Sequence, residues 1–414
     1  MAAIIDYRGK TPRKSASGIP LITARIVKAG RIEPPTEFVD PSEYDAWMRR
    51  GHPRVGDVVV TTEAPLGEIA QLTDERVALA QRLILLRGKP GVLDNTYLKY
   101  LMMSSDIQSQ LHGRASGTTV VGIKQSELRN IVLHLPAFNE QRDIAGVLGS
   151  LDEKIEQNRR TITALERVAR ALFRAWFVDF EPIKAKARGA VEFPAMAQHT
   201  FDELPTRFID SEIGLIPVGW RLEAIGNAVE VKGGGTPSTK VIEYWEGGQH
   251  HWVTPKDLSR LSQPVLLDTE RRITDAGVEQ ISSGLLPIGS VLLSSRAPVG
   301  YLAIAFVPTA INQGFIGMIC DGPLPSVYVY SWAQHVMDEI KSRASGTTFP
   351  EISKGVFRQI RVLVPSSEIL QAFAEIVNPS FSLIATLAKE TTLLRLTRDY
   401  LLPRLLSGRL VVQA

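Results

Sequence analysis

Two identical six-residue segments carry side chains suited to binding a phosphate group. Each reads Arg-Ala-Ser-Gly-Thr-Thr, at residues 114–119 and again at 343–348. An arginine beside three hydroxyl groups and a conformationally free glycine could grip an anion through backbone N–H groups and side-chain donors. A hydroxyl-rich turn that caps a helix would have the same composition. The candidate contacts are Arg114, Ser116, Gly117, Thr118, Thr119, Arg343, Ser345, Gly346, Thr347 and Thr348.

The two segments belong to a longer internal repeat. Upstream, residues 56–67 match residues 289–300, and downstream each copy continues through a short apolar segment into a long helical pattern. A repeat of this size must be interpreted first because it decides the architecture. It predicts two domains, as does a length of 414 residues, which exceeds one typical core.

The two copies differ at polar positions inside a shared frame. Glu63 falls where the second copy has Arg296, and Arg25 falls where it has Lys256. A common scaffold with divergent polar segments is typical of two related readers of different ligands, although neutral drift in surface loops produces the same pattern. We therefore add Arg25, Lys256 and Arg296 to the candidate contacts. The wider set of candidate base-reading cations is Arg25, Arg31, Arg49, Arg50, Lys256, Arg260, Arg271 and Arg272.

Two long amphipathic helices are expected to position these segments. Apolar residues recur at spacings of three and four, which is a heptad pattern. The seams are Ile144, Leu148, Leu151, Ile155, Asn158, Ile162, Leu165, Ala169, Leu172 and Trp176, and Phe373, Val377, Ser380, Ile384, Leu387, Thr391, Leu394, Arg398, Leu401 and Leu405. Helix-breaking signals at Gly149-Ser150 and Asn378-Pro379 predict a short helix before each break and a long one after it. A helix over residues 150–178 would be about 40 Å long, and antiparallel pairing would satisfy both seams.

Each copy of the globular part is expected to be a mixed α+β domain. Short apolar runs at residues 58–60, 83–86 and 131–135 predict strands, and residues 96–103 and 327–332 have helical spacing. Residues 64–67 and 297–300 place Pro and Gly as in a β-turn. The first copy has no counterpart of residues 215–226, so the C-terminal residues 406–414 are a candidate for the missing support.

No catalytic, metal or cofactor motif is found in the sequence. Residues 232–237 are glycine-rich but lack the Gly-Lys-Ser/Thr ending of a P-loop, and His250-His251 has no partner at metal-ligand spacing. Cys320, the single cysteine, has apolar neighbours and is expected to be a buried structural thiol. We expect no cofactor and no metal on this chain.

Composition favours a folded protein in the cytoplasm. The apolar fraction is 44%, no run of about eighteen apolar residues is evident, and the N-terminus lacks the pattern of a signal peptide. A net charge of +3 permits an anionic partner without requiring one.

Taken together, the repeat resembles the specificity subunit of a type I restriction-modification system. The resemblance rests on the duplicated Arg-Ala-Ser-Gly-Thr-Thr, the segment leading to Leu135-Pro136, Glu140-Gln141, the helix over 144–172, and the stretches at 176–180 and 216–220. It implies two tandem target-recognition domains, each followed by a long helix, with the helices paired as an antiparallel coiled coil. The implied boundaries are 1–137 and 209–366 for the domains, 138–180 and 367–414 for the helical regions, and 181–208 for a linker.

The resemblance also implies a function and partners. The chain would read a split, asymmetric site in double-stranded DNA, with the coiled coil as a ruler, and would have no catalysis of its own. Its partners would be two methyltransferase subunits and, through the complex, restriction and translocase subunits. For methyltransferase docking we expect Phe173, Trp176 and Phe177 with Leu402, Leu405 and Leu406, residues that could instead pack at the ends of the helices. The alternatives are a single-chain DNA methyltransferase or nuclease, and a coiled-coil scaffold that binds no DNA.

Overall fold

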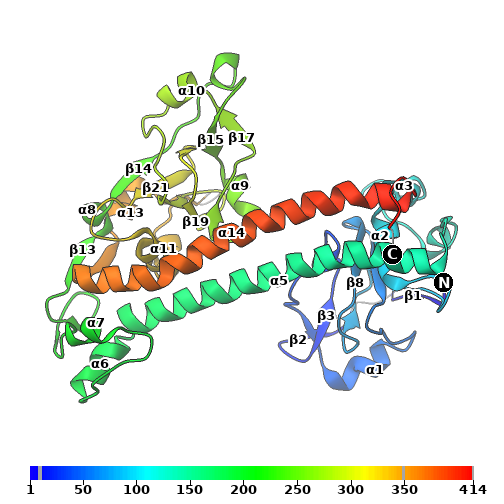
Figure 1. Cartoon of the computed structure of the whole chain (residues 1–414), viewed down its shortest axis with the longest axis horizontal. Coiled ribbons are helices and arrows are strands. Elements are labelled where there is room, and N and C mark those ends of the chain that lie inside the picture. The colour runs from blue at the N-terminus through cyan, green and yellow to red at the C-terminus, as the bar shows by residue number, and fades with distance from the viewer. Residues whose placement is uncertain (8–11, 347–349, 413–414) are drawn as a thin grey trace. The chain divides into compact units, whose positions relative to one another are not determined.

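The structure, a computed structural model, describes residues 1–7, 12–346 and 350–412. The chain forms two compact units. Unit 1 comprises Met1–Glu156 with Thr392–Ala414, and unit 2 comprises Gln157–Thr391. Each unit therefore holds one copy of the globular repeat and a part of both long helices (Figure 1). The duplication and the mixed α+β class expected from the sequence are confirmed.

Unit 1 contains short strands and helices ahead of the first long helix. They are β1 (Ala3–Asp6), β2 (Lys14–Ser15), β3 (Ile19–Ile22), β4 (Val27–Lys28), β5 (Arg31–Ile32), β6 (Phe38–Val39), η1 (Pro41–Glu43), α1 (Tyr44–Trp47), β7 (Val58–Thr62), β8 (Leu66–Gln71), β9 (Ala78–Leu79), β10 (Leu83–Arg87), α2 (Asn95–Met103), α3 (Ser105–Gly113) and α4 (Gln125–Leu128). The long helix α5 (Phe138–Phe177) follows and continues into unit 2.

Unit 2 repeats this order with additions. Its elements are α6 (Glu181–Ala187), α7 (Gln198–Asp202), β11 (Phe208–Ile209), β12 (Ile216–Pro217), β13 (Arg221–Ala224), α8 (Ile225–Ala228), β14 (Glu230–Gly233), η2 (Ile242–Tyr244), β15 (His250–Val253), α9 (Pro255–Ser259), β16 (Val265–Leu266), β17 (Arg271–Ile273), α10 (Asp275–Glu279), β18 (Val291–Ser294), β19 (Leu302–Ala305), β20 (Thr309–Ile311), β21 (Phe315–Ile319), α11 (Ser326–His335), α12 (Met337–Ser342), α13 (Lys354–Arg358) and β22 (Arg361–Val364). The long helix α14 (Ser367–Leu406) is the last of the described elements, and it returns to unit 1. Ile183 of α6 and Phe201 of α7 are buried in the core of unit 2, so the segment between the repeats is packed.

Equivalent sheets form the centre of both units. In unit 1 the strand order is β1-β10-β7-β8, and in unit 2 it is β14-β21-β18-β19-β16. Alternate residues of β7 point to opposite faces, as strand geometry requires, because Val58 and Val60 belong to one core cluster and Val59 to another. A second sheet in each unit follows the same plan, with β3 between β6 and β9 and β15 between β17 and β20.

The strand expected at residues 131–135 is absent from the structure. Its counterpart in the second copy, β22, is a strand because it pairs antiparallel with β13, from Arg221↔Val364 to Ala224↔Arg361. The first copy has no sequence equivalent of β13, so the backbone at 131–135 has no strand to pair with. Instead the side-chain amide of Gln110 both donates to the Val132 carbonyl, at 3.3 Å, and accepts from its N–H, at 3.1 Å. Of the C-terminal residues expected to supply the missing support, Leu406 and Val412 pack half-buried against this core.

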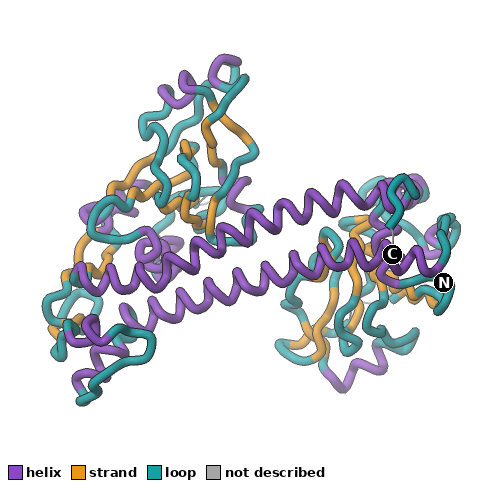
Figure 2. The backbone as a smooth tube through the Cα atoms, in the orientation of Figure 1, coloured by secondary structure: helices purple, strands orange, loops and turns teal. Residues whose placement is uncertain are grey.

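The helix breaks expected at Gly149-Ser150 and Asn378-Pro379 are wrong. Both α5 and α14 are continuous helices of 40 residues, as the uninterrupted purple coils of Figure 2 show. Asn378 and Pro379 lie on an exposed face of α14, where the Glu375 carbonyl, which loses its helical N–H partner at Pro379, can be solvated. The buried seam residues on either side outweigh the local preference for a break. Each helix is about 60 Å long at 1.5 Å per residue, and not the 40 Å expected.

Within unit 1 the two helices are joined by an ionic cluster. Asp152 of α5 lies 2.8 Å from Arg398 of α14 and also pairs with Lys99 of α2. On the same seam Leu405 of α14 joins the buried cluster of Ile144 and Leu148. The first turns of α5 therefore contact the last turns of α14, which confirms antiparallel pairing in this unit.

Within unit 2 the pairing is aromatic and polar. Phe177 of α5 meets Phe373 of α14 edge to face, with ring centroids 5.1 Å apart. Near the other end of this segment the Asn158 amide donates to Thr391 Oγ1 at 3.3 Å and to Glu390 at 2.8 Å. The polar members of the two seams thus meet one another.

Among the described residues one helix has the length and mean hydropathy of a membrane span, although its sequence holds no unbroken run of about eighteen apolar residues. It is α14, and 44% of its most apolar eighteen-residue window is buried inside the structure. Its buried side chains, among them Phe373, Val377 and Ile384, belong to the core of unit 2.

Candidate nucleic-acid interface

The first candidate surface lies where β3 ends. Here β3 runs parallel to β9, with Leu21↔Ala78, while in the second copy β15 runs parallel to β20, with Trp252↔Ala310. The pairs confirm that Leu21 and Trp252 are equivalent positions. Arg25 and Lys256 therefore follow equivalent strands, as the sequence alignment predicted.

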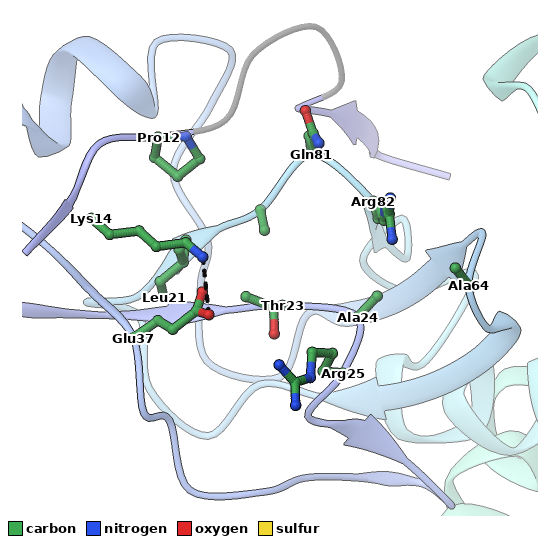
Figure 3. A pocket seen from close by; sticks show the side chains of 11 residues that line it. Pro12, Lys14, Leu21, Thr23, Ala24, Arg25, Glu37, Ala64, Gln81 and Arg82 are labelled. Carbon is green, nitrogen blue, oxygen red and sulfur yellow. Dashed lines mark ion pairs between the residues drawn. The ribbon is translucent and has the colours of Figure 1, made fainter. Parts of the chain in front are cut away.

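In unit 1 this region is an open cavity of about 240 Å³ (Figure 3). Arg25, Thr23, Lys14 and Glu37 are among the residues that line it. Lys14 Nζ lies 3.0 Å from Glu37 Oε1. Within the described residues the exposed Arg25 side chain has no hydrogen-bond or ion-pair partner. Its donors are thus available to an external acceptor.

In unit 2 the equivalent position is already occupied by an internal contact. Lys256 lies 2.9 Å from Glu270, which also accepts from Arg260 at 2.8 Å. The Lys256 hydrogen bond is the main cause of a lowered pKa for the Glu270 carboxyl. Lys256 could contact DNA only by exchanging this carboxylate for a phosphate or a base.

Glu63 and Arg296 confirm the charge difference between the copies. Glu63 pairs with Arg82 at 3.0 Å, whereas Arg296 pairs with Glu351 at 3.7 Å. Both residues follow equivalent strands, β7 and β18, and both bridge through their backbone to the end of the hexapeptide loop. The same frame thus presents opposite charges in the two units.

The hexapeptide forms an exposed loop after a helix. In unit 1 the backbones of Ser116 and Gly122 exchange two hydrogen bonds, of 2.9 and 3.0 Å, and close a loop over residues 117–121. Gly117 has φ +128°, and a Cβ there would lie 2.1 Å from the Val120 carbonyl oxygen, so only glycine fits. Within the described residues the N–H groups of 117–121 have no acceptor. They are free to bind an anion.

The second loop closes in the same way. Ser345 and Glu351 exchange backbone hydrogen bonds of 3.0 and 2.8 Å. Thr347 and Thr348 lie outside the described residues, and Gly346 has a positive φ like Gly117. The two arginines differ, because Arg114 reaches Glu127 only at 3.8 Å while Arg343 lies 2.6 Å from Glu339.

In unit 1 the structure brings the loop and the cavity together. Glu63 bridges to Gly122 of the loop, and the next residue, Ala64, lines the cavity beside Arg25 (Figure 3). In unit 2 a Cβ built on Gly314 would lie 3.3 Å from Pro255 Cγ and 3.5 Å from Arg296 Cγ, so these two side chains approach the same glycine. In unit 1 the loop, the turn after β7 and the end of β3 are therefore neighbours, and in unit 2 the turn after β18 lies next to the end of β15.

Three further residues of the first surface were not singled out from the sequence. They are Lys14, Glu37 and Gln81. A signal for Gln81 was present, because residues 78–81 and 310–313 both read Ala-apolar-x-Gln in the repeat. Glu37 lies within residues 28–50, where the two copies diverge beyond easy alignment, and nothing in the sequence marked Lys14.

The aromatic residues expected to dock a methyltransferase are not available for that role. Phe173, Trp176 and Phe177 are at most 5% exposed, in a cluster with Tyr328 and Phe373. Of their expected counterparts, Leu405 is 2% exposed, and Leu402 and Leu406 pack against the core of unit 1. These side chains hold the helices to their own units.

His250, His251 and Cys320 have structural contacts. His250 lies 2.7 Å from Asp275 and His251 lies 3.3 Å from Asp268, and no metal-ligand cluster is found among the described residues. Cys320 is half-buried and burial raises the pKa of its thiol to about 12, which disfavours a nucleophilic role.

Comparison with known proteins identifies the family. The family model described as the type I restriction modification DNA specificity domain matches residues 52–167 and 217–395. The chain belongs to this family. The two matches cover β7, β8 and β10 of the central sheet in unit 1, all strands of the central sheet in unit 2, and part of each long helix, so the family model matches both copies of the repeat.

Two relatives are specificity subunits by name. The chain is 38% identical over 191 residues to the type I restriction enzyme MjaIX specificity subunit of Methanocaldococcus jannaschii, an alignment that covers 46% of this chain and 44% of that one. It is 24% identical over 378 residues to the HindI specificity subunit of Haemophilus influenzae, covering 81% and 82%.

A solved structure has the same fold. The S subunit of a type I restriction-modification system from M. genitalium superposes with a TM-score of 0.58 at 16% identity, and the match covers 96% of this chain and 92% of that chain. The family fold therefore extends beyond the matched segments to the cavity around Arg25, which precedes residue 52.

Proposed function

We propose that this chain is the DNA-recognition subunit of a type I restriction-modification complex. Each unit reads one part of a split and asymmetric site in double-stranded DNA. The observation that carries the proposal is the pair of equivalent surfaces with different charges. In unit 1 an exposed loop whose N–H groups have no acceptor among the described residues suits a phosphate, and the second loop is closed by the same kind of backbone pair, while Glu63 and Arg296 differ at one position.

The long helices suit the role of a spacer. A continuous helix of 40 residues extends about 60 Å, more than the ~34 Å of one duplex turn, so a gap of unread base pairs between the half-sites is expected. The salt bridge of Asp152 and the hydrogen bonds of Asn158 fix the register of the pair.

Catalysis belongs to other subunits in this proposal. Two methyltransferase subunits would bind the chain and carry the methyl donor, and restriction and translocase subunits would join through the complex. The chain itself would hold no cofactor. Because its target is chromosomal DNA, the assembly would work in the cytoplasm.

Methyl transfer to DNA by purified proteins tests this proposal. The full chain alone should transfer no labelled methyl group, whereas the chain with its methyltransferase subunits should modify adenines in a two-part, non-palindromic motif. Methylation by the chain alone would favour the single-chain enzyme. A complex that binds and methylates DNA equally well without the chain would favour the scaffold.

A further inference from the structure

One cation of unit 2 is held by two tryptophans. The Cζ atom of Arg271 lies 3.7 Å from the ring centroid of Trp245 and 5.2 Å from that of Trp252. The two indoles meet edge to face with centroids 5.0 Å apart. A guanidinium stacked on an indole is fixed in orientation, and its N–H donors stay at the edge of the plane.

The glycine-rich segment that follows β14 explains why the tryptophans are rigid. Trp252 Nε1 donates to the Gly235 carbonyl at 3.1 Å, and Trp245 Nε1 donates to the Ser238 carbonyl at 3.0 Å. Gly234 packs so closely on β20 that a Cβ would lie 2.1 Å from the Ile311 carbonyl oxygen. The segment over 233–238 thus anchors both indoles to the sheet.

Arg271 differs from the other candidate cations of this unit. Lys256 and Arg260 share Glu270, and Arg272 lies 3.1 Å from Asp268. Arg271 is exposed, and within the described residues no carboxylate or carbonyl accepts from its guanidinium. The Arg271 guanidinium thus has a fixed plane, and its N–H donors have no acceptor among the described residues.

The position of Arg271 in the repeat links it to specificity. It pairs with Trp252 across β15 and β17. In unit 1 the residue equivalent to Trp252 is Leu21, whose N–H donates to the Glu37 carbonyl at 2.9 Å in the same antiparallel register as Ile19↔Val39. Arg271 and Glu37 are therefore equivalent, and Glu37 lines the cavity of unit 1 beside Arg25. At this one position the duplicated scaffold therefore carries a cation in unit 2 and a carboxylate in unit 1.

We propose that Arg271, held by Trp245 and Trp252, reads a guanine in the half-site of unit 2. This inference rests on the proposed function. A fixed guanidinium edge matches the two acceptors that guanine presents in the major groove, O6 and N7. A phosphate contact would need charge but not this orientation.

The test is a methylation motif measured with the full chain and its methyltransferase subunits on duplexes carrying randomised positions. In Arg271→Ala the preference for one G·C pair in one half-site should fall about 5- to 150-fold, with all other positions retained. Arg271→Lys should show an intermediate loss, because it keeps the charge but not the planar fork. Arg221→Ala, at an exposed cation of β13 outside the candidate set, is the control and should keep the wild-type motif.

Each contrary result has a defined meaning. An unchanged motif in Arg271→Ala, a uniform loss over all sequences, or relaxation at an A·T pair would overturn the guanine assignment. Abolished methylation in both Arg271→Ala and Arg271→Lys would also overturn it and assign Arg271 to folding, because one base contact cannot account for so much. Failure of the wild-type complex to produce a split motif would instead refute the proposed function.

Discussion

Asp152 of α5 and Arg398 of α14 lie 2.8 Å apart in unit 1, and both side chains are largely buried. Lys99 of α2 joins the same carboxylate, so one aspartate ties both long helices to the recognition domain. In unit 2 the corresponding junction joins a neutral group to a carboxylate, because the Tyr330 hydroxyl donates to Glu166 of α5 at 3.2 Å. The Tyr330 ring also packs on Phe381 of α14. The two junctions therefore respond differently to mutation and to pH.

Replacing Asp152 with Ala should destabilise unit 1 by about 3–5 kcal/mol, because it leaves the buried Lys99 without its carboxylate and Arg398 with only the exposed Asp399. Urea unfolding followed by circular dichroism measures the change. Asp143→Ala, at an exposed position of α5, is the control and should stay within about 0.5 kcal/mol of the wild type. An equally small effect of Asp152→Ala would show that the cluster adds nothing.

The same carboxylate predicts a pH dependence. Burial alone would raise the pKa of Asp152, but the Lys99 ammonium and the hydrogen bonds to the carboxylate together lower it from 3.8. A carboxyl with a lowered pKa stabilises the fold above its unfolded pKa and loses that contribution as pH falls through the folded value. The stability difference between wild type and Asp152→Asn should thus be constant from pH 7 to 5 and shrink below about pH 3.8. A difference that grows on acidification would contradict the ion pair.

The hydrogen bond between Asn158 and Thr391 is a polar contact within the apolar seam of the two long helices, and mutation tests its contribution to stability. Asn158→Leu alone should cost about 1–3 kcal/mol, because the Thr391 hydroxyl and the Glu390 carboxylate lose a donor. Adding Thr391→Val should recover part of that loss, since both polar groups of the direct pair are then gone. Thermal unfolding of the single and double variants gives the coupling energy. Strictly additive effects would mean that the two residues do not interact.

The hexapeptide arginines predict a sequence-independent effect. Arg114→Ala or Arg343→Ala should weaken duplex binding similarly for all sequences and lower the slope of log K against log salt by about 1, as loss of a phosphate contact does. Binding titrations of the full complex at several salt concentrations measure both quantities. Unchanged binding at every salt concentration would disprove the phosphate role.

Glu270→Gln should act in the opposite direction. Removing the carboxylate releases Lys256 and Arg260, so non-specific duplex affinity at low salt should rise severalfold and the gain should shrink as salt is added. Glu279→Gln, with no ion pair among the described residues, is the matched control. Lower affinity of Glu270→Gln would mean that this carboxylate takes part in DNA recognition.

Periodic patterns were sufficient to predict the duplicated scaffold. The strands at Val58 and Leu83, the helices α2 and α11 and both heptad seams follow from apolar spacing that burial then satisfies. The helix breaks were wrong because packing along the seam outweighs local preference at Gly149 and Pro379. The strand at 131–135 was wrong because a strand needs a partner, and the first copy lacks the counterpart of β13.

The residues proposed to contact DNA bases were harder to predict, because their positions depend on how the loops bring distant parts of the sequence together. Arg271 and Trp245 are 26 positions apart in the sequence, with β15, α9 and β16 between them, and only the register of β15 with β17 reveals that Arg271 and Glu37 correspond. Charge alone gave eight candidates of equal standing. The structure separates them by showing which cations are already paired.

The methylation motif of the assembled complex, compared between wild type and one variant in each unit, tests the central claim most directly. The wild type should give two half-sites separated by unread base pairs, with Arg25→Ala relaxing positions in one half only and Arg271→Ala relaxing positions in the other half only. A continuous or palindromic motif, or relaxation of the same half by both variants, would contradict the account of two units that read different parts of one site.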